Sequence, residues 1–416
     1  MIKRLLVSVF LFLSFISFAQ EGTSSPYSYY GLGEMKFKGT VENRSMGGLS
    51  VFPDSIHINL QNPAFYSQLK LVSFTIGASY NTTKLKTNAQ SENARRTTLD
   101  YLAVGIPMGK FGAGFGLMPY TAVGYKIQNQ QTIEDMVQQR QFRGSGGLNK
   151  AFIGGAYQIN KNLSFGVEGG YYFGNIETSS IYSFGSALIG TRELNESIAN
   201  GIGFSTGLSY QAKVGKKLQF SAAATYASET TMTLKNSRNI STVNFSSGGI
   251  TVVDPVNIEV ADTKVKMPSR YSFGAGIGEN KKWMVGSEVT FSQSSNYANR
   301  FEDINDATFE DGVKYSVGGY FIPNYNSFTS YWSKITYRGG LKYEETGLMV
   351  NNKTIKDAGF TLGVGLPLGG TFSNINIGLE YGKRGTRDAA LVEENYLNIS
   401  LGLSLNDRWF VKRKFD

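Results

Sequence analysis

Six ionisable side chains occur in segments where apolar and polar residues alternate, and each occupies a position on the polar side of the alternation. Such a set supports two kinds of chemistry: salt bridges that fix neighbouring segments, or a polar track that receives a charged ligand. In the second case Arg338 and Lys342 form a candidate carboxylate site, because a guanidinium grips a carboxylate with two parallel hydrogen bonds. The six residues are Glu168, Glu288, Lys314, Arg338, Lys342 and Glu380.

The chain has few of the residue types on which enzymatic catalysis usually depends. His57 is the only histidine and cysteine is absent, so a histidine-based triad would have to recruit His57; we predict a structural hydrogen-bonding role for it instead. Glycine-rich runs such as GVGLPLGG lie inside extended segments and precede no helix, so they are not phosphate-binding loops. The acidic loop with Asp303, Asn305 and Asp306 lacks the EF-hand spacing. We predict no enzymatic activity, no metal and no cofactor.

The N-terminus has the pattern of a secretory signal peptide over residues 1–19. Lys3 and Arg4 precede an apolar run that ends at Phe18, and Ala19 stands at a plausible cleavage site. The run is too short to span a bilayer, and no later apolar run reaches about 18 residues. The formal net charge of +9 is scattered along the chain, which argues against nucleic acid as a partner. The mature chain is therefore exported, either soluble or as a membrane β-barrel.

The elements that position the polar residues are strands. Residues 399–405 place isoleucine and three leucines on one face and small or polar residues on the other, and the same period of two recurs in about 14 segments of about ten residues, the length of a tilted membrane-spanning strand. Short and long links alternate between them, as in outer-membrane barrels; one link, residues 323–331, is longer than this pattern allows. We predict an all-β fold, a transmembrane antiparallel β-barrel of about 14 strands over residues 71–410. The segments begin near residues 71, 98, 111, 150, 162, 202, 217, 270, 282, 313, 333, 358, 373 and 396.

Aromatic residues support this interpretation. With a periplasmic N-terminus, the odd-numbered segments carry an aromatic residue at their outer ends, which is typical of the interfacial girdle of such barrels. The ionisable residues then face the lumen, since a lysine or arginine facing lipid at mid-bilayer costs about 2–4 kcal/mol. The girdle residues are Tyr80, Phe173, Tyr226, Phe291, Tyr343 and Tyr381.

Residues 20–70 do not alternate, and we predict that they form a hatch inside the lumen. A barrel of about 14 strands is too wide for its own side chains to fill. The inward phase is rich in glycine, which leaves room for an inserted segment or eases strand curvature. These glycines are Gly112, Gly114, Gly116, Gly203, Gly207, Gly274, Gly276, Gly363 and Gly365.

The sequences SMGGLSV and NPAFYSQL resemble the N-terminal hatch of the FadL/TodX family, and SPYSYYGLG together with the basic tail resembles the version found in Bacteroidota. The resemblance implies a barrel of 14 strands plugged by the hatch, and its motif falls on Gly47, Gly48, Asp54, Asn62, Pro63 and Ala64. Trp409 and Phe410 resemble the C-terminal signal that barrels present to the insertion machinery, and a basic tail, residues 411–416, follows them.

The resemblance leaves two functions open. Many family members carry small hydrophobic compounds inward, whereas PorV-like relatives serve as non-transporting accessory barrels in an envelope protein machine, for type IX secretion or outer-membrane protein assembly. We expect the first function, a channel for the uptake of small hydrophobic compounds, and keep the accessory barrel as the alternative, which the polar stretch QNQQTIEDMVQQRQFRGSGG favours. Either one places the mature chain in the outer membrane of a Gram-negative bacterium. The expected partners are membrane lipid, the insertion machinery, and a hydrophobic small molecule or a partner envelope protein.

Overall fold

The computed structural model describes residues 22–133, 136–185, 187–246, 248–300, 307–369 and 371–408. The signal peptide, the candidate insertion signal Trp409–Phe410, the basic tail and the acidic loop positions Asp303, Asn305 and Asp306 lie outside these ranges.

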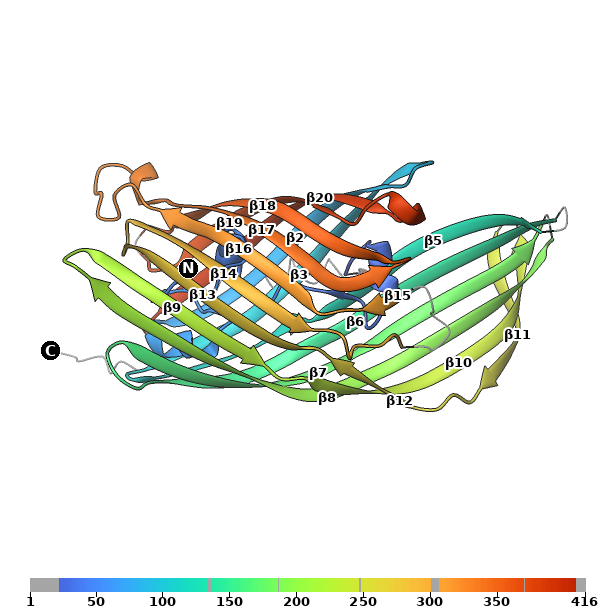
Figure 1. The fold of residues 1–416 in the computed structure, drawn as a ribbon, viewed down its shortest axis with the longest axis horizontal. Helices are drawn as coiled ribbons and strands as arrows, with labels where there is room; N and C mark the ends of the chain where they lie inside the picture. Colours follow the sequence, from blue (N-terminus) through green and yellow to red (C-terminus); the bar gives the residue numbers. More distant parts are fainter. Residues whose placement is uncertain are drawn as a thin grey trace.

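Fourteen antiparallel strands close into a barrel (Figure 1). Each pairs with the next member of the set, and the last pairs with the first, from Val72 opposite Asp407 to Lys86 opposite Glu393. The predicted fold class and the approximate strand number are confirmed. The strands are β2 (Val72–Lys86), β3 (Ser91–Met108), β4 (Phe111–Pro119), β6 (Met136–Gln158), β7 (Leu163–Phe184), β8 (Ile189–Val214), β9 (Leu218–Ala227), β13 (Ser269–Glu279), β14 (Trp283–Gln293), β16 (Gly312–Phe321), β17 (Thr336–Val350), β18 (Lys353–Pro367), β19 (Asn374–Arg384) and β20 (Glu393–Asp407).

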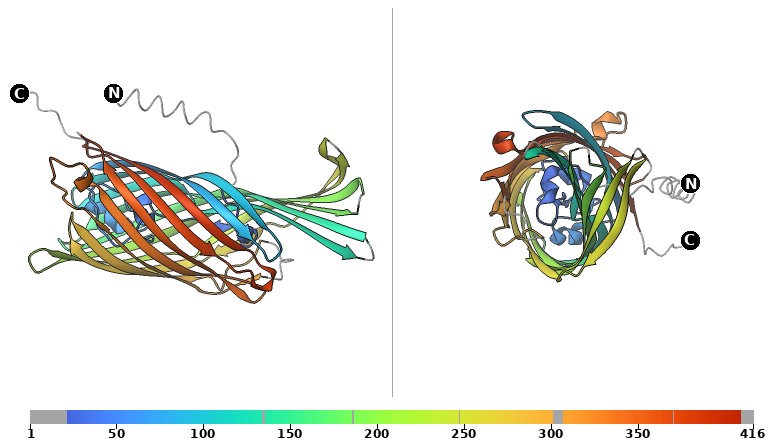
Figure 2. Two further views of the ribbon diagram at one scale, coloured as in Figure 1. Left: turned by 90° about the horizontal axis from the view of Figure 1, so that it is seen from above. Right: turned by 90° about the vertical axis from the view of Figure 1, so that its right-hand side faces the viewer.

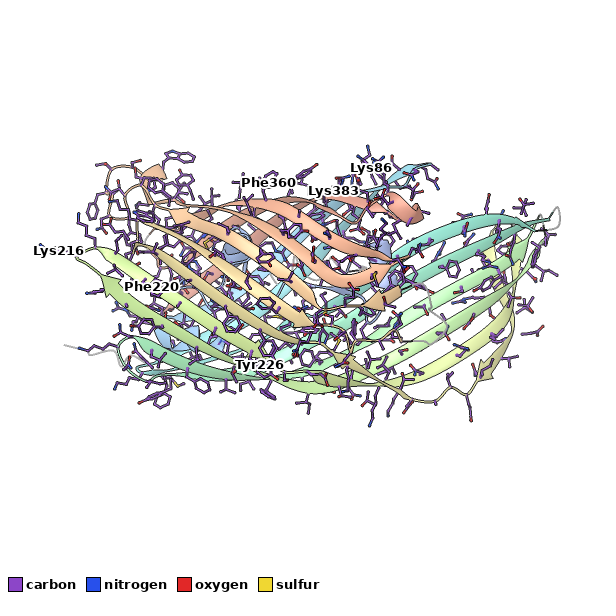
Figure 3. The ribbon with its side chains drawn as sticks, in the orientation of Figure 1. Lys86, Lys216, Phe220, Tyr226, Phe360 and Lys383 are labelled. Atoms are coloured by element: carbon purple, nitrogen blue, oxygen red, sulfur yellow. The ribbon has the colours of Figure 1, made fainter. Side chains whose placement is uncertain are left out.

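The wall has an apolar outside and a polar inside. Leu401 on β20 is 49% exposed, whereas its neighbours Ser400 and Ser404 are buried. Figure 3 shows Phe220 and Phe360 on the outer surface, between Lys216 at the end with short turns and Lys86 near the opposite rim. An outward apolar face is what a lipid-embedded strand requires.

Four strands that the sequence did not predict extend the wall beyond the barrel. Together with the long outer parts of β6, β7 and β8 they form a curved sheet at one end of the molecule, which we call the flange (Figures 1 and 2). The sequence interpretation assigned polar loops here and started β6 and β8 about a dozen residues too late. It was wrong because residues 128–132 of β5 and 235–239 of β10 are polar on both faces, and the apolar alternation elsewhere in these strands, such as Val265 and Met267 in β12, extends over only a few residues. The added strands are β5 (Thr121–Ile133), β10 (Thr230–Ser246), β11 (Gly249–Ile258) and β12 (Thr263–Met267).

The opposite end of the barrel has short turns, with one exception. Residues 322–335 connect β16 to β17 and contain a short helix, η3 (Trp332–Lys334). Phe328 is 99% exposed and Trp332 is 72% exposed in this loop. A further short strand, β15 (Ala307–Phe309), pairs with β17, and a helical turn, η4 (Asp388–Ala390), precedes β20.

Residues 22–70 lie inside the barrel, and we call them the hatch segment (Figure 2). None of the helices in the described ranges is long and apolar enough to cross a membrane. Apolar hatch side chains pack against the wall, for example Phe52 with Met284, and Tyr66 with Tyr101 and Phe152. The elements of the hatch segment are η1 (Pro26–Tyr29), β1 (Glu34–Met35), α2 (Val41–Arg44) and η2 (Pro63–Gln68).

Inward glycines make space for the hatch segment. A Cβ atom on Gly112 would collide with the carbonyl of Tyr66, and one on Gly207 would collide with the side chain of Asn62. Of the two reasons for these glycines that the sequence left open, room for an inserted segment therefore holds at these positions.

Candidate functional site

Asn62, Pro63 and Ala64 fix the end of the hatch segment to the wall. The Asn62 side chain accepts a hydrogen bond from the Ala64 N–H at 3.0 Å and so caps η2. Its amide also donates to the carbonyl of Leu208 on β8 at 3.2 Å. Pro63 begins the helix, where its missing N–H has no cost.

Gly47 and Gly48 form a tight turn against β17 and β18. Both have positive φ angles, 72° and 90°, which glycine adopts without steric cost. The Gly47 N–H donates to Thr361 Oγ1 at 2.8 Å, and a Cβ on Gly47 would lie 2.7 Å from the carbonyl oxygen of Leu341. The turn therefore requires glycine for its backbone angles and for its closeness to the wall.

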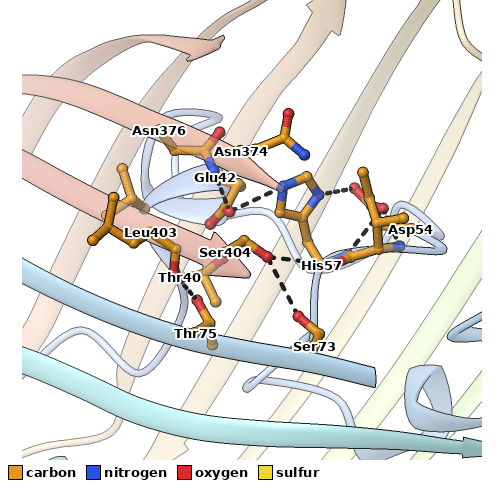
Figure 4. Close-up of polar contacts among 12 residues, drawn as sticks. Thr40, Glu42, Asp54, His57, Ser73, Thr75, Asn374, Asn376, Leu403 and Ser404 are labelled. Carbon is orange, nitrogen blue, oxygen red and sulfur yellow. Dashed lines mark hydrogen bonds and ion pairs between the residues drawn. The ribbon is translucent and has the colours of Figure 1, made fainter. Parts of the chain in front are cut away.

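Asp54 belongs to a charged cluster with His57 and Glu42 (Figure 4). His57 Nδ1 lies 2.7 Å from Asp54 Oδ2, and Nε2 lies 3.4 Å from Glu42 Oε1, an ion-pair distance. Asn376 of β19 donates to the same Glu42 oxygen at 2.7 Å. Burial opposes a charge on His57, but the carboxylates of Asp54 and Glu42 outweigh it and raise the pKa of His57 above its usual range. The structure therefore places His57 between two carboxylates, which favour its protonated form.

Glu168 and Glu288 bind the hatch segment directly. Tyr66 donates its hydroxyl to Glu168 Oε2 at 2.6 Å, and Lys150 lies 2.6 Å from the other oxygen of Glu168. Ser50 donates both its N–H, at 2.9 Å, and its hydroxyl, at 2.8 Å, to Glu288 Oε2. Both glutamates are buried.

Lys342 and Glu380 form an ion pair at 2.5 Å that continues to the outer end of the hatch segment. Lys342 also lies 3.5 Å from Asp357, which pairs with Arg384 at 3.2 Å, and Arg384 pairs with Glu34 of β1 at 2.5 Å. Burial alone would raise the pKa of Glu34, but Arg384 overrides it and lowers the pKa to about 2.

Sequence reasoning missed Arg384 and Asp357, and also the ion pair between Arg44 of α2 and Asp100 of β3 at 3.2 Å. Nothing in the sequence pattern distinguishes these charged residues from the other charged residues of their strands and helix. Only the strand register, in which Asp357 lies opposite Arg384, reveals the partnership.

Arg338 and Lys342 do not converge on one site. Arg338 donates to Asn376 Oδ1 at 3.0 Å, close to the charged cluster of the hatch, and does not line the lumen cavity. Lys342 lines that cavity but is engaged by Glu380 and Asp357. Lys314 also lines the cavity, with its ammonium 5.5 Å from the ring centre of Phe37.

The lumen cavity beside the hatch segment has a volume of about 370 Å³. Its wall is rich in charged groups, and nine tyrosine and phenylalanine residues also line it. No group of side chains in the described ranges is arranged to hold a metal ion. The charged residues of its lining include Glu34, Lys36, Lys38, Arg44, Lys150, Glu168, Arg270, Lys314, Lys342, Glu344, Asp357, Glu380 and Arg384.

A closed wall of this kind around an N-terminal segment is a β-barrel of the outer-membrane type, and solved structures share its fold. The CymD monoaromatic hydrocarbon channel superposes with a TM-score of 0.58 at 14% identity, covering 92% of this chain and 99% of CymD. The Pseudomonas putida toluene transporter TodX superposes with a TM-score of 0.59 at 16% identity, covering 90% of this chain and 100% of TodX. A Pseudomonas aeruginosa FadL homologue superposes with a TM-score of 0.59 at 12% identity, covering 89% of this chain and 98% of the homologue. At these identities the likeness concerns the fold.

The family is given by the sequence itself. The model of the BamG family matches residues 1–416, so the chain belongs to the BamG family. None of the curated proteins is similar enough to this chain to count as a relative.

Proposed function

We propose that this protein is a non-transporting accessory barrel of the outer membrane, which binds partner proteins in outer-membrane protein assembly. The observation that carries the proposal is the character of the lumen: a hatch segment bonded to the wall at several levels, beside a cavity whose lining includes many charged groups.

The contacts of the hatch segment work against the passage of a hydrophobic molecule. A guest of that kind would have to separate Ser50 from Glu288 and Tyr66 from Glu168, and leave buried carboxylates without partners. Each unsatisfied buried polar group costs about 1–3 kcal/mol, and more where the group is charged. An apolar guest offers these groups no hydrogen bond in return.

Two exposed surfaces support a role in binding proteins. At the end with short turns, the loop of residues 322–335 exposes Phe328 and Trp332. At the opposite end, the flange extends the sheet beyond the barrel (Figure 1). Aromatic residues on exposed loops and sheet edges are common features of protein-binding surfaces. The Bam prefix of the family name favours outer-membrane protein assembly over secretion.

Transport of small hydrophobic compounds is the second candidate, and the fold likeness to CymD and TodX favours it.

Purification of the native protein in a mild detergent distinguishes the two functions. We expect a stoichiometric complex with other outer-membrane proteins, and depletion of the protein should lower the amount of newly assembled outer-membrane barrels. A solitary barrel that carries a bound hydrophobic compound, with normal barrel assembly after depletion, would refute the proposal.

A further inference from the structure

The flange has two margins, formed by β5 and β11, and they differ in how their backbone is protected. β11 contains Pro255, which has no N–H, and Asp254 immediately before it has a positive φ of 49°. The strand pairs with β10 through a register shift between Ile240 and Thr242. Proline and bulges are devices that prevent a further strand from adding to a sheet edge. The described part of β5, Thr121–Ile133, contains neither.

Among the strands in the described ranges, only β1 pairs with the outer edge of β5, and it does so at the beginning of the strand. β1 pairs antiparallel with it at Ala122 and Thr121, and the Gly124 N–H donates to Ser28 Oγ at 3.1 Å. Beyond Gly124, no strand in the described ranges pairs with this edge.

The backbone direction of β5 follows from these contacts. N–H and C=O groups alternate sides along a strand, so Gln128, Gln130 and Thr132 point their backbone groups the same way as Gly124, away from β6. The residues between them, such as Asn129 opposite Arg140, face β6. Residues 128–132 are exposed on both faces of the strand.

We propose that the edge of β5 over residues 128–132 binds an extended, polar and uncharged segment of a partner outer-membrane protein, which adds to the flange as an antiparallel strand in line with β1. A row of outward N–H and C=O groups is matched only by another extended backbone. The side chains Gln128, Asn129, Gln130, Gln131 and Thr132 carry no charge and supply amides for hydrogen bonds to a polar partner strand. The inference rests on the proposed function and names its binding surface.

The β5 strand of a second copy does not fit this edge. Two copies in one membrane have the same orientation, so their β5 strands run in the same direction and cannot pair as β1 pairs with β5. All strand pairs of the sheet are antiparallel.

Proline substitutions test the edge without breaking the ladder to β6. Gln128→Pro with Gln130→Pro removes two outward N–H groups and leaves the residues that face β6 unchanged. Gln128→Thr with Gln130→Thr is the matched control, because it changes the same side chains and keeps both N–H groups. Heat-dependent gel mobility of the barrel verifies that each variant is folded.

In mild detergent, we expect the proline variant to retain at least tenfold less partner than the wild type and the threonine variant to retain a normal amount. Hydrogen exchange of residues 128–132 should be at least tenfold slower in the complex than in the isolated barrel. A photoreactive residue at position 130 should cross-link to one segment of the partner.

Full retention of the partner by the proline variant, or a cross-link to a second copy of this chain, would overturn the inference while leaving the proposed function intact. The absence of any stoichiometric partner from the wild type would instead refute the proposed function.

Discussion

Single residues hold the hatch segment through buried polar contacts, and Glu168 makes the densest set. It accepts from Tyr66 and pairs with Lys150, and Ser205 donates to it at 3.3 Å. A carboxylate in this position links the hatch to three neighbouring strands, because Lys150 lies on β6, Glu168 on β7 and Ser205 on β8.

Loss of Glu168 should therefore cost more than loss of its hatch partner. Glu168→Ala leaves Lys150 buried without a counter-charge, and breaking a buried ion pair in this way costs about 3–5 kcal/mol. Tyr66→Phe removes one hydrogen bond and should cost about 1–3 kcal/mol. Guanidinium unfolding in detergent micelles gives both values, and equal losses for the two variants would show that the Lys150 pair contributes nothing.

The charged cluster around His57 makes the hatch sensitive to pH. The pKa of His57 is higher in the folded protein than in the unfolded chain, so protonated His57 stabilises the fold. This contribution is fully present below about pH 6.5, the ordinary pKa of histidine, and is lost as the pH rises through the higher pKa of the folded state. Asp54 behaves oppositely: burial would raise its pKa, but His57 lowers it, so its contribution disappears only in acid.

We expect protease cleavage within residues 41–60 to become several-fold faster between pH 6 and pH 9. His57→Gln should be cleaved faster at pH 6 and should show a flat profile over the same range. A wild-type profile as flat as that of the variant would mean that His57 is not charged in the folded protein.

At the scale of elements, the inward glycines of β4 define where the hatch can lie. Gly112 faces the backbone of Tyr66, whereas Gly155 on the neighbouring β6 has no atom nearer than 3.8 Å to the position of a Cβ. The two glycines lie on paired strands and differ in the face they occupy.

Gly112→Ala should displace η2 and expose the hatch segment, since the Tyr66 carbonyl cannot yield without breaking the helix. Overpacking of this kind costs about 1–3 kcal/mol. Gly155→Ala, the matched control, should be neutral. Trypsin sensitivity of the hatch is the measurement, with gel mobility reporting the barrel, and equal sensitivity of the two variants would contradict the assignment.

Elements with one lipid-facing side were predictable from the sequence, and elements without one were not. Residues 399–405 of β20 showed the alternation because lipid selects apolar side chains on one face. Residues 128–132 of β5 and much of β10 contact water on both faces, so no alternation marks them as strands. The inward position of Glu168 and Glu288 followed from the same alternation, but their hatch partners Tyr66 and Ser50 did not, because contacts across about 100 residues or more depend on where the hatch lies.

At the scale of the whole molecule, the hatch segment contacts the wall at both ends of the barrel. Ser25 donates to Glu394 at 2.5 Å and Tyr27 to the carbonyl of Val392 at 2.6 Å near the flange end. Asn62 and η2 bind the wall toward the end with short turns. Under the proposed function, a barrel fixed in this way would present its two ends to other proteins without opening.

An engineered disulfide between the hatch segment and the wall tests most directly whether the protein works with a fixed hatch. The chain has no cysteine, and the Cβ of Val51 lies 3.3 Å from the position of a Cβ on Gly274, close to the separation of about 3.5–4.5 Å in disulfides. Val51→Cys with Gly274→Cys should therefore lock the hatch, and Val51→Cys alone is the control. We predict that the oxidised double variant supports outer-membrane barrel assembly as well as the control does. Loss of function on oxidation that is restored by reduction would show that the hatch must move, as in a transporter, and would contradict the account.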